Sequence, residues 1–228
     1  MNNLQIKIFG ENLILDPRRA MVWPSEESIF ISDTHFGKSS IFRKYGLQIP
    51  EGSDEEMLIS ISNLIKDYQL KRLFILGDFV HGALPEGDKF FELFNTWRRA
   101  HNHISVVLVR GNHDVDLQGL CLNRLEIYDR FMVKSAELVH DPASATKNVY
   151  VSGHIHPYLK FRSSQESVRM PIFWCSSKML ILPAFGLFTG GKNIELSYDE
   201  VAYAIFPDGS DIELFTIFLT TSTPFKCP

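Results

Sequence analysis

The sequence predicts an α/β fold in which two β-sheets stack face to face and helices cover the outside. Two patterns lead to this prediction. Residues 29–109 alternate short apolar runs with helical patterns, which indicates parallel strands joined by helical crossovers. Residues 149–215 carry short strand patterns with turns between them, which indicates a mostly antiparallel second half. The chain has 228 residues and no repeat or linker, so we expect one domain over residues 1–228.

Four strands are expected before the first helix. Residues 6–9, 13–15 and 20–23 are short apolar runs separated by turn-forming residues. The apolar run at residues 29–32 ends abruptly at Asp33, as expected for a strand that is buried on both faces.

Two helices are expected in the rest of the first half. Ser53 and Glu56 match a capping box, and the apolar residues that follow have helical spacing, so we predict a helix over residues 53–68. A group of aromatic residues between 90 and 97 predicts a second helix that begins near Pro85. Buried strands are expected before and after this second helix, at residues 73–76 and 104–109.

The second half of the chain shows no convincing helix. Its strand patterns are short and separated by turns, and residues 224–228 are expected to be a frayed tail. The strands are expected at residues 149–152, 159–161, 172–174, 180–182, 201–204 and 212–215.

Composition excludes several classes of protein. The formal net charge of −4 argues against a protein that holds nucleic acid by bulk charge alone, although bound cations would add local positive charge. The start of the chain lacks a signal-peptide pattern, and no apolar run is long enough to span a membrane. The three cysteines are far apart and fit neither a disulfide framework nor a zinc-thiolate site, so we expect a cytoplasmic protein without a membrane partner.

Five clusters of Asp, Asn and His lie at or near the ends of expected strands. The ends of the strands of a sheet converge on one edge of the molecule, which is where sites form. The clusters are Asp33-Thr34-His35, Gly77-Asp78, Gly111-Asn112-His113-Asp114, Val139-His140-Asp141 and Gly153-His154-Ile155-His156.

These clusters have the chemistry of a two-metal site. Imidazole and carboxylate groups together bind borderline cations such as Mn, Fe, Zn or Ni. Two such cations about 3.5–4 Å apart can share a hydroxide and clamp a phosphate during in-line attack. Taken singly, each Asp would be read as a turn or helix cap and each His as a surface or core residue. All five clusters in this order favour the metal site.

The order Asp-x-His, Gly-Asp, Gly-Asn-His-Asp, His, Gly-His-x-His resembles the calcineurin-like metallophosphoesterase superfamily over about residues 29–157. The resemblance implies a four-layer α/β fold in which a central β-sandwich is flanked by helices. It also implies a hydrolase that cleaves phosphate esters with a hydroxide bridging two metal ions.

A narrower resemblance is carried by residues 20–24 (AMVWP), 31–38 (ISDTHFGK), 173–174 (FW) and 182–191 (LPAFGLFTGG). These segments are similar to the ligase-associated DNA-damage-response endonucleases, small bacterial phosphoesterases of the same superfamily. The resemblance implies an endonuclease linked to DNA repair, with a functional connection to a DNA ligase and a helicase.

Seven side chains are implied as metal ligands, in two sets that share one carboxylate. The resemblance places Asp33, His35 and His156 on the first metal, Asn112, His140 and His154 on the second, and Asp78 between them. Mn is the favoured metal because hard carboxylate and amide oxygens accompany the imidazoles, and Fe, Zn, Ni or Mg are the alternatives.

Two further residues are implied as catalytic. His113 would lie near the scissile phosphate and donate to the leaving oxygen or a phosphoryl oxygen, and Asp114 would orient His113. His81 could face the same site or be a simple loop residue. Lys38 and Arg43 could meet substrate phosphates, but a solvated helix or loop face is the favoured interpretation.

The expected function is hydrolysis of a phosphodiester, in DNA or RNA. The alternative within enzymes is a small-molecule phosphatase or a cyclic-nucleotide phosphodiesterase, which would use the same metal core with a different substrate groove. An inactive metal-binding scaffold is the third interpretation, and it ranks last because all the ligand types are present. A nucleic-acid groove would need Lys and Arg gathered on the metal face. The 23 basic residues form no run, so the sequence leaves this open.

Overall fold

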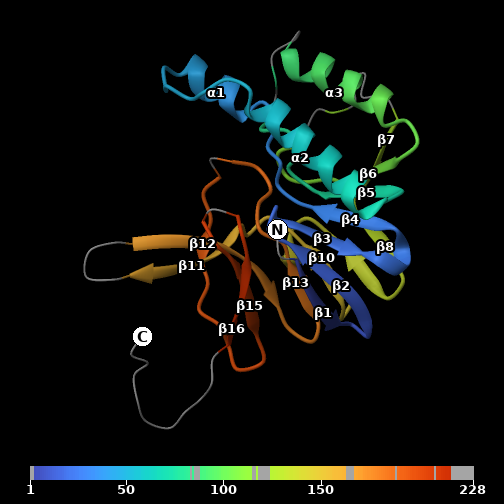
Figure 1. Ribbon diagram of the computed structural model, residues 1–228, viewed down its shortest axis with the longest axis vertical. Coiled ribbons are helices and arrows are strands. Elements are labelled where there is room, and N and C mark those ends of the chain that lie inside the picture. The colour runs from blue at the N-terminus through green and yellow to red at the C-terminus, as the bar shows by residue number, and fades with distance from the viewer. Residues whose placement is uncertain are drawn as a thin grey trace.

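The computed structural model describes residues 3–82, 84, 88–114, 117, 124–162, 167–187, 189–207 and 209–216. Two β-sheets stack on each other, and the helices α1, α2 and α3 lie on one side of the stack (Figure 1). This is a mixed α/β sandwich of two sheets with helices outside it, as the sequence predicted.

The first sheet has seven strands in the order β1 to β7. Its first four strands form antiparallel neighbours, and β4 to β7 run parallel, with helices between β4 and β5 and between β5 and β6. The strands are β1 (Leu4–Ile8), β2 (Glu11–Asp16), β3 (Ala20–Trp23), β4 (Ser28–Ile31), β5 (Arg72–Leu76), β6 (Ser105–Val109) and β7 (Leu125–Tyr128).

The helices are α1 (Lys38–Lys44), α2 (Ser53–Tyr68) and α3 (Lys89–Ala100), and a short 3-10 turn, η1 (Pro24–Glu26), precedes β4. The apolar faces of α2 and α3 pack on the outer face of the first sheet, through Met57, Ile61, Phe90 and Phe94. The predicted bounds of α2 are confirmed. The predicted capping box is wrong, because Gly52 is the N-cap and the Ser53 hydroxyl lies 2.6 Å from the Ser39 hydroxyl instead.

The second sheet has nine strands. Most of its pairs are antiparallel, as predicted, but β10 runs parallel to both of its neighbours, β9 and β13, and β11 runs parallel to β14. A 3-10 turn, η3 (Pro142–Ser144), follows β9. The strands are β8 (Phe131–Val133), β9 (Ala136–Leu138), β10 (Tyr150–Ser152), β11 (Pro157–Arg162), β12 (Ser167–Cys175), β13 (Met179–Ile181), β14 (Lys192–Asn193), β15 (Val201–Ile205) and β16 (Ile212–Thr216).

A shared core lies between the two sheets. Phe30 and Phe74 stack with ring centroids 4.9 Å apart, and Phe173 and Leu180 of the second sheet belong to the same fully buried cluster. Burial of aromatic and aliphatic side chains of this size stabilises each by about 1.5–3 kcal/mol, which holds the sheets in a fixed relation. The core therefore fixes the edge at which the polar strand ends meet.

Several elements were not predicted. The helix α1 and the short strands β7, β8, β9 and β14 lie where the sequence shows no long apolar period. The predicted tail at 224–228 and the predicted helix start at Pro85 lie outside the described residues. No helix in the described part of the chain is long and apolar enough to cross a membrane.

Candidate metal centre

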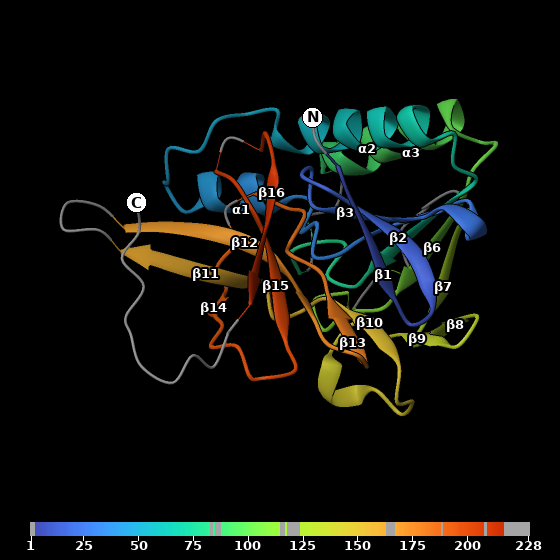
Figure 2. The same ribbon diagram turned by 60° about the horizontal axis from the view of Figure 1, so that its bottom comes forward.

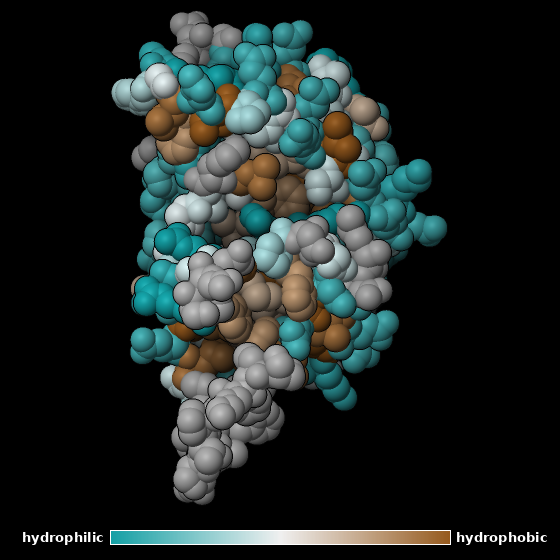
Figure 3. All heavy atoms as spheres, turned by 60° about the vertical axis from the view of Figure 1, so that its left-hand side comes forward, coloured by the Kyte–Doolittle hydropathy of each residue, from teal (hydrophilic) through white to brown (hydrophobic). Residues whose placement is uncertain are grey.

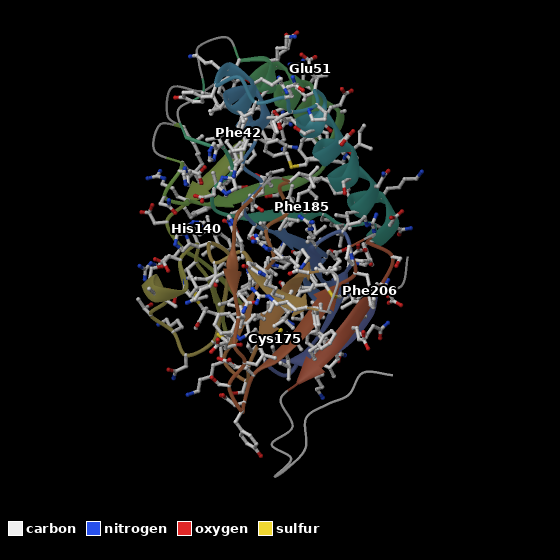
Figure 4. All side chains as sticks on the ribbon, turned by 90° about the vertical axis from the view of Figure 1, so that its left-hand side faces the viewer. Phe42, Glu51, His140, Cys175, Phe185 and Phe206 are labelled. Carbon is white, nitrogen blue, oxygen red and sulfur yellow. The ribbon has the colours of Figure 1, made fainter. Side chains whose placement is uncertain are left out.

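The predicted clusters meet at one edge of the stacked sheets. Asp33, Asp78 and Asn112 follow β4, β5 and β6 of the first sheet, and His140 and His154 follow β9 and β10 of the second. Figure 4 shows His140 between the helical half of the molecule and the strands of the second sheet. Each sheet therefore contributes a part of the centre.

The first group consists of Asp33, His35 and His156, whose ligand atoms all lie within 4.8 Å of one another. Asp33 is fully buried, and its Oδ1 lies 3.1 Å from Nε2 of His156. Its carboxylate also accepts the backbone N–H of His154, at 3.0 Å to Oδ2. The loop after β13 completes this group, because the Gly190 carbonyl lies 3.0 Å from Nδ1 of His156.

The second group consists of Asp78, His140 and His154, again with ligand atoms within 4.8 Å of one another. Nε2 of His140 lies 3.3 Å from Oδ1 of Asp78 and 3.1 Å from Nδ1 of His154. Oδ1 of Asn112 lies 3.0 Å from the same nitrogen. The amide oxygen of Asn112 thus faces the second group.

Asp78 connects the two groups. Its Oδ1 faces His140, and its Oδ2 lies 3.8 Å from Nε2 of His35 in the first group. A carboxylate placed in this way presents one oxygen to each group, which is the geometry of a ligand that bridges two cations.

Two glycines allow the backbones of the two sheets to approach closely at the centre. Gly77 has φ of 76°, and a Cβ at this position would overlap the imidazole of His140, so only glycine fits here. Gly153 is equally restricted, since a Cβ would meet the Asp33 carboxylate. The two sheets approach closely at these glycines, and that approach places the ligands within reach of one another.

Burial and neighbouring charges shift several pKa values in the centre. Burial lowers the pKa of His35 to about 3, which keeps its ring neutral and able to bind a cation. Burial alone would raise the pKa of Asp33, but the close contact with His156 and the nearby imidazole of His140 lower it on balance. Burial opposes a charge on His156, but its contacts with Asp33 and Gly190 raise its pKa.

The residues fit two divalent cations. Nε2 of His35 and Nε2 of His156 are buried without a hydrogen-bond partner among the described residues. Buried polar atoms rarely stay unsatisfied, and both nitrogens face carboxylate oxygens across a small space. The Leu76 carbonyl lies 3.0 Å from Nδ1 of His140, and such a contact holds the tautomer that leaves Nε2 free for a cation.

His113 lies beside the two groups without belonging to either. Its side chain is 40% exposed, and its Nε2 lies 4.0 Å from Oδ2 of Asp78. Asp114 lies beneath, and its two oxygens accept the N–H groups of Gly111 and Val80 at 2.8 and 3.2 Å. The expected contact between Asp114 and the His113 ring is replaced by these bonds to the backbone. Asp114 therefore holds the loop that carries His113.

His81 faces the centre, which the sequence had left open. Its ring stacks on that of His113 at 5.2 Å between centroids, and its Nδ1 lies 3.4 Å from Nδ1 of His35. Burial and the nearby Lys38 lower the pKa of His81 to about 4. The signal in the sequence was the spacing of three residues from Asp78.

The two basic residues after the first motif point to different places. Lys38 is half-buried in the first turn of α1, and burial lowers its pKa while the charge of Asp78 opposes this shift. It therefore lies near the centre, contrary to the favoured interpretation of a solvated face. Arg43 instead donates to the Pro50 carbonyl at 3.1 Å and lines a cavity between the helices.

Comparisons with known proteins show the family of this chain. A model of the calcineurin-like phosphoesterase family matches residues 28–167. A solved structure, the nuclease MPE from Pseudomonas putida, is 26% identical, covers 94% of this chain and 100% of its own, and has a TM-score of 0.81. The phosphoesterase Yfce from E. coli is 18% identical and covers 84% of this chain and 99% of its own, with a TM-score of 0.43. None of the curated protein sequences matches the chain. The chain belongs to the calcineurin-like phosphoesterase family and is a phosphoester hydrolase.

Proposed function

We propose that this protein is a phosphodiesterase that cleaves nucleic acid with two divalent cations, of which Mn is the favoured species. The observation that carries the proposal is the position of Asp78 between two groups of imidazole and carboxylate ligands. The 26% identical structural neighbour is a nuclease, which supports a nucleic acid as the substrate.

Each side chain of the centre has a distinct task in this proposal. Asp33, His35 and His156 hold one cation, Asn112, His140 and His154 hold the other, and Asp78 holds both. Two cations in such a site neutralise phosphoryl oxygens and lower the pKa of a shared water molecule.

His113 would act on the leaving group. Its partly exposed ring lies next to the metal ligands and lacks a carboxylate partner closer than the 4.0 Å to Asp78 among the described residues. An imidazole in this position can donate a proton to the departing oxygen, and a contribution of this kind is typically about 10²–10⁴-fold. Asp114 supports it by bonding the backbone at Gly111 and Val80.

A preference for diesters over monoesters follows from the charges around the centre. A monoester carries about one more negative charge than a diester near neutral pH, and sites that select monoesters add fixed cations near the metals. Among the residues that flank the ligand motifs in the sequence, Lys38 lies near the ligands, and burial lowers its pKa. The segments that carry the motifs thus supply little fixed positive charge, and Arg19 and Arg169 line a separate cavity beside His156.

The test is a comparison of kcat/KM for bis-p-nitrophenyl phosphate and p-nitrophenyl phosphate with Mn-loaded protein. We expect the diester to be cleaved faster, and we expect nicking of DNA or RNA at low salt. A monoester preference of tenfold or more without nuclease activity would favour the small-molecule phosphatase. No hydrolysis of any ester by protein with two bound ions would favour the inactive scaffold.

The wider context is also part of this proposal. The narrower resemblance of residues 182–191 and the other quoted segments supports a role in DNA repair beside a ligase and a helicase. The cysteine pattern supports action in the cytoplasm, since Cys175 is a buried free thiol whose pKa burial raises. Both statements stay predictions.

A further inference from the structure

A small cavity opens directly beside the metal centre. It has a volume of about 160 Å³, and its wall includes His156, which also belongs to the first ligand group. Two arginines and one tyrosine line it as well, namely Arg19, Arg169 and Tyr158. Any group bound there would therefore lie next to the cleaved bond.

Arg19 reaches this cavity from the turn between β2 and β3. It has φ of 65°, a conformation that non-glycine residues rarely adopt, and its N–H closes the turn on the Asp16 carbonyl at 3.0 Å. Its guanidinium lies 3.2 and 3.4 Å from the carbonyls of Ala184 and Gly186. It forms no ion pair with a carboxylate in the described part of the chain, and burial lowers its pKa.

More basic residues continue from the cavity along the hairpin of β11 and β12. Side chains two residues apart on a strand share a face, so Tyr158, Lys160 and Arg162 point the same way. The register places Arg169 opposite Lys160, which puts it on this face too. The guanidinium of Arg169 lies 5.1 Å from the centre of the Tyr158 ring.

The opposite face of the hairpin is apolar. Leu159 pairs with Met170 and Phe161 pairs with Val168, and Met170 belongs to a buried cluster of the second sheet. The hairpin projects from the body of the molecule, as Figure 2 shows. In Figure 3 the side from which it projects is turned forward, and hydrophilic residues border a hollow near the middle of that face. The basic face is thus an extension of the centre.

The lack of ion pairs distinguishes these cations from other basic residues of the protein. Lys160, Arg162 and Arg169 form no ion pair with any carboxylate among the described residues. Several basic side chains elsewhere are neutralised by an acidic neighbour at 2.7–3.3 Å. These pairs are Arg18–Asp16, Lys71–Glu27, Arg72–Glu26, Arg130–Glu137 and Lys134–Glu11.

We propose that Arg19 and the basic face of the β11–β12 hairpin form a phosphate track that binds the substrate strand on one side of the cleaved bond. The inference rests on the proposed function, because a track of this kind serves a polymeric substrate. Alternate residues of a strand lie about 6.5 Å apart, a spacing comparable to that of successive phosphates in an extended nucleic-acid strand. Tyr158 offers an aromatic surface beside the first of these cations, as single-strand binding grooves do.

The track is tested by binding of a fluorescein-labelled single-stranded oligonucleotide in EDTA, where no cleavage occurs. The test variant is Lys160→Ala/Arg162→Ala/Arg169→Ala. The matched control is Lys7→Ala/Lys66→Ala/Lys178→Ala, which removes the same charge from exposed positions away from the hairpin face. Each phosphate contact contributes about 0.7 to the slope of log affinity against log salt for single strands, so three lost contacts lower the slope by about 2.

We expect the hairpin variant to bind at least about tenfold more weakly at low salt and the control to lose much less. The Arg162→Lys/Arg169→Lys variant, which keeps all three positive charges, should bind the oligonucleotide with most of the wild-type affinity. Equal losses in the hairpin and control variants, or no loss in either, would overturn the track.

A second measurement separates the track from the proposed chemistry. With Mn, a Lys160→Ala/Arg162→Ala variant, which keeps the cavity-lining Arg169, should cleave bis-p-nitrophenyl phosphate as the wild type does and should lose severalfold or more in kcat/KM on the oligonucleotide. Equal loss on both substrates would overturn the track. Wild-type protein that binds the oligonucleotide through the track but hydrolyses neither diester would refute the proposed function and still support the binding face.

Discussion

Five of the seven candidate ligands adopt left-handed backbone conformations. Positive φ at non-glycine residues costs of order 1–3 kcal/mol each and persists where the surrounding structure determines it. Hydrogen bonds within the centre hold these conformations in place. One of them runs from the His35 N–H to the Asp78 carbonyl at 2.8 Å. The five are Asp33, His35, Asp78, His154 and His156, with φ between 47° and 68°.

Asp78 gives the sharpest prediction for a single residue. Asp78→Asn should lose both cations, because one carboxylate faces both groups. Elemental analysis after equilibration with Mn should find close to two ions in the wild type and far fewer in the variant. Asp129→Asn, which changes an exposed carboxylate, is the control. Two retained ions in Asp78→Asn would contradict the bridging geometry.

His113 should affect rate and leave metal content unchanged. His113→Ala should retain both ions and lose about 10²–10⁴-fold in kcat on a diester with a poor leaving group. The loss should be smaller for a p-nitrophenyl leaving group, which departs without a proton. His103→Ala, at an exposed histidine, serves as the control. An unchanged rate with the poor leaving group would show that the ring is not the proton donor.

The sequence predicts the strand ends that carry the candidate ligands better than the surroundings of those side chains. Strand ends placed Asp33 and Asp78 at a common edge, and in the structure the His140 ring lies within 3.8 Å of both carboxylates. The contact between His81 and His113 depends on the left-handed turn at Asp78, which no local pattern reveals. The surroundings of Asp114 were also missed. Its oxygens accept the backbone N–H groups of Gly111 and Val80, where a contact with the His113 ring was expected.

At the scale of elements, the start of α2 is tied to the first metal motif. Oδ2 of Asp54 accepts the N–H of Gly37 at 3.1 Å, two residues after His35. Burial, with a contribution from the charge of Asp88, raises the pKa of Asp54 to about 6, although the hydrogen bond from Gly37 and the charge of Arg43 oppose the shift. Ionisation of Asp54 near neutral pH therefore costs free energy because its carboxylate is buried.

The effect of Asp54 on stability has a definite sign. The unfolded chain loses this proton near the ordinary value of 3.8 and the folded chain near 6, so stability falls as the pH rises between these values. Asp54→Asn keeps an acceptor for Gly37 without a charge. We expect its Tm relative to wild type to increase from pH 4 to pH 7, by thermal unfolding. Glu55→Gln, at an exposed neighbour, should show no such trend. A pH-independent difference would exclude the buried carboxyl as the cause.

The same scale shows why some elements escape prediction. The helix over residues 53–68 has several apolar residues at helical spacing, and its bounds were found. In contrast, α1 has only seven residues, with Ser39 as its one buried residue, so it shows no apolar period. The strand β9 has three residues, and one of them is Glu137, whose carboxylate accepts the N–H groups of Thr146 and Lys147. Long-range contacts, which local patterns do not contain, determine these elements.

At the scale of the whole molecule, the metal centre lies between two sheets. The first sheet contributes Asp33, Asp78 and Asn112, and the histidines His140 and His154 come from the second. A cation bound to ligands from both sheets therefore joins the two halves of the sandwich. It binds the folded state selectively, because the unfolded chain does not assemble these ligands.

Metal binding should therefore stabilise the whole fold. A ligand present at 100 times its Kd contributes about 2.7 kcal/mol for one site. For a chain of this length each kcal/mol raises the Tm by roughly 2–4 °C, so one site filled with Mn should raise the Tm by roughly 5–10 °C over EDTA-treated protein, and two filled sites by up to about twice as much. Thermal unfolding followed by circular dichroism measures this shift. Asp78→Asn should abolish most of it, whereas Asp129→Asn should retain it. A Tm that does not respond to Mn, or that responds equally in Asp78→Asn, would mean that the cations do not join the two sheets through Asp78.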